Sequence, residues 1–261
     1  MDKNTIIAKV THDSDEKLLL ARIFDKYEQT ERRGIPTATA FLSPHEQSLA
    51  QIMLNTADIR SDFLFDGGYE GAERKLILFL PDWAENCGDE IRFLRASFHG
   101  TDSTLTHRDI LGSLMGLGIT REKVGDILIS PHSADVVAAA SVAEFLLRDW
   151  SSAGRVRLTV TEIDRGSLCI PEAKITEVQD TVSSLRLDAV VSSAFSISRG
   201  KAADLIAAGK VSLDHTPCLK TDKSVGEGSI LSARGFGKAV VRECSRLSKK
   251  GRIILVIDRY I

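Results

Sequence analysis

The sequence predicts an α+β protein with N-terminal helices, a central ferredoxin-like or RRM-like α+β sandwich, and a C-terminal module of two helices with short strands. Capped apolar stripes of helical spacing occupy the N-terminal region. The order strand, helix, strand, strand, helix, strand follows over residues 91–163, and two short helical stripes begin near Leu185. We therefore expect a helical region at 1–72, the sandwich at 73–165, a linker strand at 166–184 and the last module at 185–261.

Two helices are predicted in the N-terminal region. From Asp15 to Arg33 apolar residues recur at helical spacing, and Gly34-Ile35-Pro36 ends the pattern. Ser43-Pro44-His45-Glu46 then combines a capping serine, a proline at the first helical position and a glutamate three residues after the serine. This signature predicts a second helix. A glycine-rich turn over residues 66–71 separates it from the rest of the chain.

The central elements follow from apolar runs and capping signals. The run 76–80 predicts a buried strand added to the sandwich. Its four regular strands are expected at 91–98, 126–129, 135–139 and 155–163. Thr106 with Asp109, and Ser141 with Glu144, predict the capped starts of its two helices.

The sandwich is not expected to read RNA bases. RRM-like sheets stack bases on aromatic side chains of their central strands. The strand 135–139 contains no aromatic residue, and Phe93 and Phe98 are expected to lie in the core.

The C-terminal module begins with an apolar helical stripe from Leu185 to Ala194. Ser198 caps a second helix, which Gly209 ends. Short strands are expected at 211–213 and 229–232, and residues 168–184 form an extended connection.

Composition excludes several classes of protein. Of the 261 residues, 43% are hydrophobic and 27% are charged, which does not fit a disordered or fibrous chain. No apolar run reaches the roughly 20 residues that cross a bilayer, and the N-terminus lacks a targeting pattern. We therefore expect a cytoplasmic protein with no membrane partner. The cysteines are widely separated, which argues against a zinc site or disulfides: Cys87, Cys169, Cys218 and Cys244.

Charge is unequally divided along the chain. Residues 182–261 contain 14 Lys and Arg against 7 Asp and Glu, whereas residues 1–181 contain 20 against 29. A local excess of cations attracts polyanions even when the net charge of the chain is −2. We expect the C-terminal module to bind RNA phosphates through basic side chains and a helix start. The expected residues are Arg186, Ser198, Arg199, Lys201, Lys210, Lys220, Lys223, Arg234 and Lys238.

Three motifs in this module resemble the S4 RNA-binding domain. They are Ser184-Leu185-Arg186-Leu187-Asp188, the pattern Ser198-Arg199-x-x-Ala202-x-x-Leu205-Ile206-x-x-Gly209-x-Val211, and Arg234-Gly235-x-Gly237-Lys238. The family usually follows the strand with Asn-Gly, but this chain has Asp214-His215.

Motifs upstream are similar to those of the bacterial YlmH-type S4 proteins. They include residues 41–47, 67–75, 105–112 and 121–127. The resemblance implies a noncatalytic cytoplasmic protein that binds ribosomal RNA of the large subunit and tRNA, and rescues stalled ribosomal complexes. The acidic portion before the S4 module could contact a ribosomal protein or brace the S4 module.

Two patterns in the sequence could indicate an enzyme. Arg186-Leu187-Asp188 matches the Arg-Leu-Asp motif of pseudouridine synthases, but it lies within the first S4 helix and no other catalytic pattern accompanies it. His107 beside Asp109 could transfer protons, although helix capping explains Asp109. Residues 73–75 behind the glycine-rich turn could hold a phosphate or form a solvated edge. We expect no catalytic residues, metal or cofactor.

Overall fold

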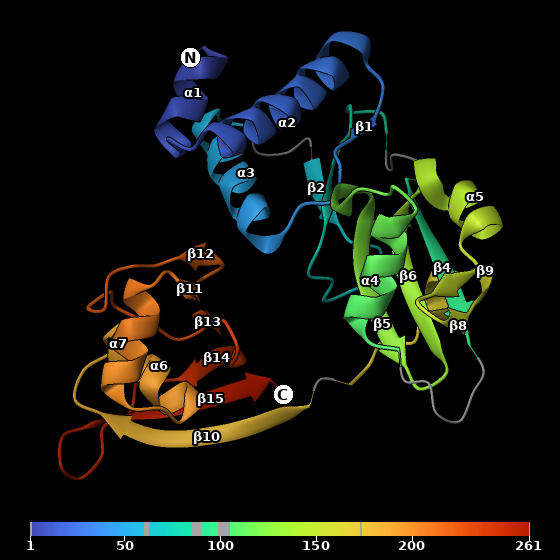
Figure 1. Cartoon of the computed structure of the whole chain (residues 1–261). Coiled ribbons are helices and arrows are strands. Elements are labelled where there is room, and N and C mark those ends of the chain that lie inside the picture. The colour runs from blue at the N-terminus through green and yellow to red at the C-terminus, as the bar shows by residue number, and fades with distance from the viewer. Residues whose placement is uncertain (1, 60–62, 85–89, 99–104, 173, 261) are drawn as a thin grey trace. The chain divides into compact units, whose positions relative to one another are not determined.

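The computed structural model describes residues 2–59, 63–84, 90–98, 105–172 and 174–260. It divides into two compact units, Met1–Pro171 and Glu172–Ile261, which are described separately (Figure 1). Both units combine helices with antiparallel sheets, which confirms the predicted α+β class. The division falls within the expected linker strand at 166–184.

The N-terminal unit begins with three helices. The capping box of Ser43 and Glu46 starts α3 as predicted, and Gly34 ends α2 in the left-handed conformation at φ +61°. The first helix was not predicted, because its short apolar pattern gives a weak signal. The bounds are α1 (Lys3–Val10), α2 (Ser14–Arg33) and α3 (Pro44–Thr56).

A three-stranded antiparallel sheet follows, in the order β1-β3-β2. Its strands are β1 (Thr37–Ala38), β2 (Phe63–Asp66) and β3 (Leu76–Phe79). The strand near 76–80 was expected as an addition to the sandwich, and this was wrong, because it lies at the centre of a separate sheet. All four residues of β3 are buried: Ile77 and Phe79 pack in the helical core, and Leu76 and Leu78 pack toward the sandwich.

The sandwich has the predicted ferredoxin-like order of elements, with a four-stranded antiparallel sheet in the order β5-β6-β4-β9. Helices α4 and α5 lie on one face of this sheet (Figure 1). A small hairpin, β7 (Ser152–Ala153) with β8 (Val156–Arg157), precedes the last strand, and two 3-10 helices flank the sheet. The bounds are β4 (Ile91–Ser97), α4 (His107–Gly116), η1 (Arg121–Lys123), β5 (Val124–Ser130), β6 (Ser133–Ala139), α5 (Ala140–Asp149), β9 (Thr159–Ile163) and η2 (Arg165–Ser167).

One of the two predicted helix caps in the sandwich is present. Thr106 and Asp109 form a capping box at the start of α4. The predicted Ser141 cap is wrong: Ala139 is the N-cap of α5, and no side chain caps this helix. The reason is that β6 continues directly into α5, so the helix starts before Ser141.

The chain itself covers both faces of the sandwich sheet. Leu94, Ala96 and Val136 pack under the helices, whereas Phe93 and Val137 pack on the opposite face against Phe41. A Cβ atom on Gly68 would lie 2.6 Å from the Phe93 ring, so the glycine-rich turn touches this ring directly. Phe93 and Phe98 are only 9% and 2% exposed, as predicted for core residues. The face on which RRM domains stack bases is therefore sealed around Phe93.

A buried ion pair closes another part of the same face. Arg95 donates two hydrogen bonds of 2.7 Å to the fully buried carboxylate of Asp135. Arg95 also donates to the carbonyl of Ser167, and Asp135 accepts from the backbone N–H of Cys169. These bonds fix the chain that leaves β9 across the sheet.

The C-terminal unit packs two helices, α6 (Leu187–Phe195) and α7 (Arg199–Ala207), with a six-stranded antiparallel sheet. Part of the expected linker belongs to this sheet, since β10 (Ile175–Val182) pairs with β15 along its whole length. The sheet is larger than expected because β12, β14 and β15 were not predicted. Its order is β10-β15-β14-β13-β11-β12, with β11 (Val211–Leu213), β12 (Thr216–Pro217), β13 (Ile230–Ala233), β14 (Gly237–Glu243) and β15 (Ile253–Tyr260).

Candidate nucleic-acid interface

The starts of α6 and α7 are joined by one carboxylate. Asp188 accepts two hydrogen bonds of 3.1 Å from Arg199, and two of 3.2 and 3.3 Å from Arg186. Burial raises the pKa of the Asp188 carboxyl, but the hydrogen bonds and charges of the two arginines outweigh it, and the net pKa is lowered. Two guanidinium groups thus share one negative charge, which leaves a net positive charge at this helix crossing.

Beside this ion pair, a cation lies over an aromatic ring. Ser198 caps α7, because its hydroxyl accepts from the backbone N–H of Lys201. The Lys201 ammonium lies 5.1 Å from the centre of the Phe236 ring, within cation–π range. Phe236 in turn contacts Phe195, and Arg259 lies 5.9 Å from the Phe195 ring.

The loop that contains Lys220 and Lys223 is held against the start of α6. The N–H of Leu187 donates to the Lys223 carbonyl at 2.8 Å, and the N–H of Asp188 donates to Thr221 at 3.0 Å. Both lysine side chains are exposed. The loop therefore places these cations next to the Asp188 ion pair.

The remaining expected cations surround the β13–β14 connection. The N–H of Arg234 donates to the Lys210 carbonyl at 2.9 Å, so the end of α7 and the end of β13 adjoin. Gly235 follows with φ +87°, a conformation that suits glycine in this tight turn. Lys238, on β14, lies 5.3 Å from the ring of Tyr260 on β15.

Asp214-His215 stands where the S4 family usually has Asn-Gly, and it still forms a two-residue turn. Both residues have positive φ, at 49° and 66°, between the paired residues Leu213 and Thr216. This is the backbone that Asn-Gly commonly provides in a two-residue hairpin turn. The Asp214 carboxylate also accepts from the N–H of Ile230 at 2.8 Å, which ties the turn to β13.

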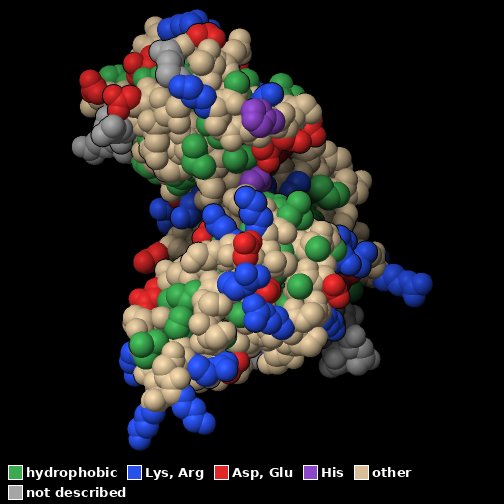
Figure 2. All heavy atoms as spheres, turned by 90° about the vertical axis from the view of Figure 1, so that its left-hand side faces the viewer, with side chains coloured by type: hydrophobic (Ala, Val, Ile, Leu, Met, Phe, Trp, Pro, Cys, Tyr) green, Lys and Arg blue, Asp and Glu red, His purple; other side chains and the backbone are tan. Residues whose placement is uncertain are grey.

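The nine expected residues lie at the starts of α6 and α7, in the 220–223 loop and around the β13–β14 connection, and they are defined here as the basic surface. Lys and Arg side chains gather on the face of the C-terminal unit that carries α7 (lower part of Figure 2). Five of the nine form no ion pair with any described residue: Lys201, Lys210, Lys220, Lys223 and Arg234. By contrast, Arg242 pairs with Glu177 and Asp258, outside this group.

Three contributors were missed by sequence reasoning: Phe236, Tyr260 and Arg259. Phe236 lies between the two glycines that were noted, so the motif itself pointed to it. Tyr260 and Arg259 lie on β15, which was not predicted. The Tyr260 ring reaches Lys238 because β15 pairs with β14, and the Arg259 guanidinium lies over the Phe195 ring.

In the N-terminal unit, the candidates for proton transfer and phosphate binding, Asp109 and residues 73–74, make structural contacts. Asp109 caps α4, and the pKa of His107 is lowered by burial and by the charge of Arg121. The backbone N–H groups of Glu73 and Arg74 donate to Asp126, so these residues brace the turn. Among the described residues, no three His, Cys, Asp or Glu side chains could hold a metal ion, and no helix could cross a membrane.

Comparison with known proteins gives matches to both units. Residues 90–166 match the family described as "Putative RNA-binding domain in YlmH", and residues 185–231 match the S4 domain. The chain is 33% identical to the ribosome-associated protein quality control protein P2 of Bacillus subtilis over 223 residues, which are 85% of this chain and 86% of that protein.

A solved structure supports the fold alone. The cell division protein YlmH from Streptococcus pneumoniae aligns with a TM-score of 0.50 and 22% sequence identity, covering 62% of this chain and 98% of that one. The identity and coverage of the Bacillus relative, together with the two domain matches, show the family. The chain belongs to the YlmH family of S4-domain proteins.

Proposed function

We propose that this protein is a noncatalytic, cytoplasmic RNA-binding protein that associates with the large ribosomal subunit through its basic surface. The observation that carries the proposal is the group of five cations without ion pairs to described residues, which adjoins the aromatic ring of Phe236. Exposed cations neutralise RNA phosphates, and a nearby ring can stack on an unpaired base. The Bacillus relative, whose name places it in ribosome-associated quality control, supports the ribosome as the source of the RNA.

The proposal extends to stalled ribosomal complexes that carry tRNA. Two adjoining groups of cations favour this: one around Asp188 and the Lys223 loop, the other around Arg234 and Lys210. Such a surface can contact phosphates of two RNA segments at once, for example ribosomal RNA and a tRNA. The N-terminal unit then acts as a brace or docks on ribosomal protein, since its acidic balance disfavours RNA.

Crosslinking of the protein to ribosomes, followed by sequencing of the attached RNA, tests this proposal. We expect crosslinks from the C-terminal unit to ribosomal RNA of the large subunit, and to tRNA only in complexes that contain it. Crosslinks confined to the small subunit, or to the N-terminal unit, would refute the assigned partner and surface. Mass mapping of ribosomal RNA from cells lacking the gene should show no missing modification, and a missing pseudouridine would show that the protein is an enzyme.

A further inference from the structure

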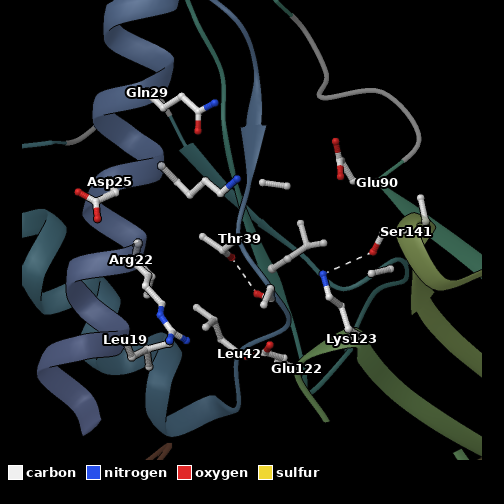
Figure 3. A pocket seen from close by; sticks show the side chains of 17 residues that line it. Leu19, Arg22, Asp25, Gln29, Thr39, Leu42, Glu90, Glu122, Lys123 and Ser141 are labelled. Carbon is white, nitrogen blue, oxygen red and sulfur yellow. Dashed lines mark hydrogen bonds between the residues drawn. The ribbon is translucent and has the colours of Figure 1, made fainter. Parts of the chain in front are cut away.

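The N-terminal unit contains a cavity of about 560 Å³ that the proposed function does not use. It lies between α2 on one side and the segment containing Lys123 and the start of α5 on the other (Figure 3). Ala38, at the end of β1, and Thr39, Ala40 and Leu42, in the segment that follows, also line it. This volume is within the range of small-molecule sites and is much larger than a single inorganic ion requires.

Three cationic side chains line the cavity from two sides. Arg22 and Lys26 come from α2, one turn apart, and Lys123 comes from η1. None of the three forms an ion pair with a residue that the structure describes, and Lys123 donates at 3.4 Å to the hydroxyl of Ser141. Asp25, between the two α2 cations, also lines the cavity and pairs with Lys3 (Figure 3).

The convergence of these cations favours an anion in the cavity. The lining also contains the carboxylates of Asp25, Glu90 and Glu122, but within the described part of the chain no ion pair joins any of them to the three cations. The cations can therefore bind an anion in a partly enclosed site, where charges are weakly screened. Ser141, in the first turn of α5, adds a hydroxyl at the same wall. A phosphate group fits this set, because it accepts several hydrogen bonds from cations and hydroxyls at once.

The rest of the lining favours a ligand with more than a phosphate. Glu90 and Glu122 offer carboxylates that accept hydrogen bonds from hydroxyl or amino groups, and Gln29 offers an amide. Ribose hydroxyls would donate hydrogen bonds to these carboxylates. Leu19, Ile23, Leu42 and Leu76 supply apolar contacts for a ring.

Part of the backbone beside the cavity is already paired. The N–H of Thr39 donates to the carbonyl of Ile77 in β3, and the Ala40 carbonyl accepts from the Thr39 hydroxyl at 2.8 Å. The N–H of Phe41 donates to the carbonyl of Glu122. Recognition of a base in this cavity therefore depends on the side chains that line it.

We propose that this cavity binds a ribonucleoside phosphate, either as a free nucleotide or as the terminal nucleotide of an RNA. Arg22, Lys26 and Lys123 hold the phosphate, the two glutamates accept from ribose or base donors, and the apolar side chains contact the base. This site is separate from the basic surface, since every lining residue belongs to the N-terminal unit.

Isothermal titration of the full-length protein with AMP, adenosine and inorganic phosphate tests the proposal. We expect one saturable site for AMP, with at least tenfold weaker binding of adenosine and of phosphate. The Arg22→Gln/Lys26→Gln variant should bind AMP at least tenfold more weakly, because it loses two charged donors. Lys17→Gln, a matched change on α2 outside the cavity, should bind as the wild type does.

Two further measurements test the proposal independently of the α2 double variant. Lys123→Gln removes a cation from a different element, so it should weaken AMP binding even if the α2 double variant does not fold. Short RNAs with and without a 5′-phosphate distinguish the sources: preference for the phosphorylated end supports a terminal nucleotide, and binding of AMP alone supports a free nucleotide.

Several results would overturn the proposal. These are absence of saturable AMP binding, equal loss in Lys17→Gln, or tighter binding of an oligoglutamate peptide than of AMP. Loss of AMP binding in a Lys210→Glu/Arg234→Glu variant would place the nucleotide on the basic surface and would also overturn it. Retained AMP binding in that variant, with loss of ribosome binding, separates this site from the proposed function.

Discussion

The Asp188 carboxylate accepts hydrogen bonds from both Nε and Nη2 of Arg199, each 3.1 Å long. This bidentate contact joins the first turn of α6 to the first turn of α7, and it holds the acidic residue of the Arg-Leu-Asp sequence between two guanidinium groups. The arrangement gives Asp188 a bracing role. Arg199 is held by this contact while 52% of its side-chain surface stays exposed.

Replacement of Asp188 should affect stability more than RNA affinity. Asp188→Asn removes the shared negative charge and leaves Arg186 and Arg199 near each other, so we expect a loss of about 1–2 kcal/mol in the free energy of unfolding. RNA affinity should stay constant or rise, because the surface gains one positive charge. Urea denaturation and RNA titration measure the two effects. Asp204→Asn, on the exposed side of α7, is the control; a selective loss of RNA binding in Asp188→Asn would contradict the bracing role.

The same residue should make stability depend on pH in the acid range. Its pKa is lowered in the folded protein from an ordinary value of 3.8. A lowered carboxyl pKa stabilises the fold above the unfolded-state value, and this contribution is lost as the pH falls through the folded-state value. The difference in unfolding free energy between wild type and Asp188→Asn should therefore be constant above about pH 4 to 5 and shrink below it. A difference that grows on acidification would show the opposite linkage.

Single cations of the basic surface should each contribute one phosphate contact. Lys210→Gln, Lys223→Gln and Arg234→Gln should each reduce the slope of log affinity against log salt concentration by about 0.7 to 0.9. Fluorescence titration of RNA between low and moderate salt measures these slopes. Lys249→Gln, in the β14–β15 loop, should leave the slope unchanged. Equal changes in all four variants would mean that net charge, rather than this surface, determines binding.

The contact between the glycine-rich turn and the Phe93 ring can be tested with two glycines of this turn. Gly68 and Gly71 both have positive φ, at 87° and 83°, but only at Gly68 would a Cβ atom meet the Phe93 ring. Gly71→Ala should cost about 1 kcal/mol from backbone strain, and Gly68→Ala about 2–3 kcal/mol or more because the clash is added. Thermal denaturation of both variants gives the comparison. Equal costs would show that the turn does not press on Phe93.

Local signals predicted most elements of the fold. The short helix α1 was missed because its apolar pattern is weak, and the strands that were missed depend on long-range pairing. The capping boxes at Ser43 and Thr106 depend on residues three apart, so the sequence alone identified them. The location of β3 depends on partners that lie at Thr37–Ala38 and Phe63–Asp66, which no local pattern reveals.

The basic surface, too, could be predicted only in part from the sequence. Its cations could be selected from charge and motif, because they stand in short segments at helix ends and turns. The shared ion pair at Asp188 and the rings of Phe236 and Tyr260 could not, since each depends on elements that meet only in the folded chain. Arg199 and Lys201 look equivalent in the sequence, yet one is bound to a carboxylate and the other lies over a ring.

Sedimentation with large ribosomal subunits at moderate salt tests the central claim most directly. The Lys210→Glu/Lys223→Glu/Arg234→Glu variant reverses three exposed cations of the basic surface, whereas Lys174→Glu/Lys249→Glu/Lys250→Glu makes the same charge change elsewhere in the C-terminal unit. We predict that the first variant stays in the supernatant while the second pellets with the subunits as the wild type does. Pelleting of the first variant, or equal loss of both, would contradict the assignment of RNA binding to this surface.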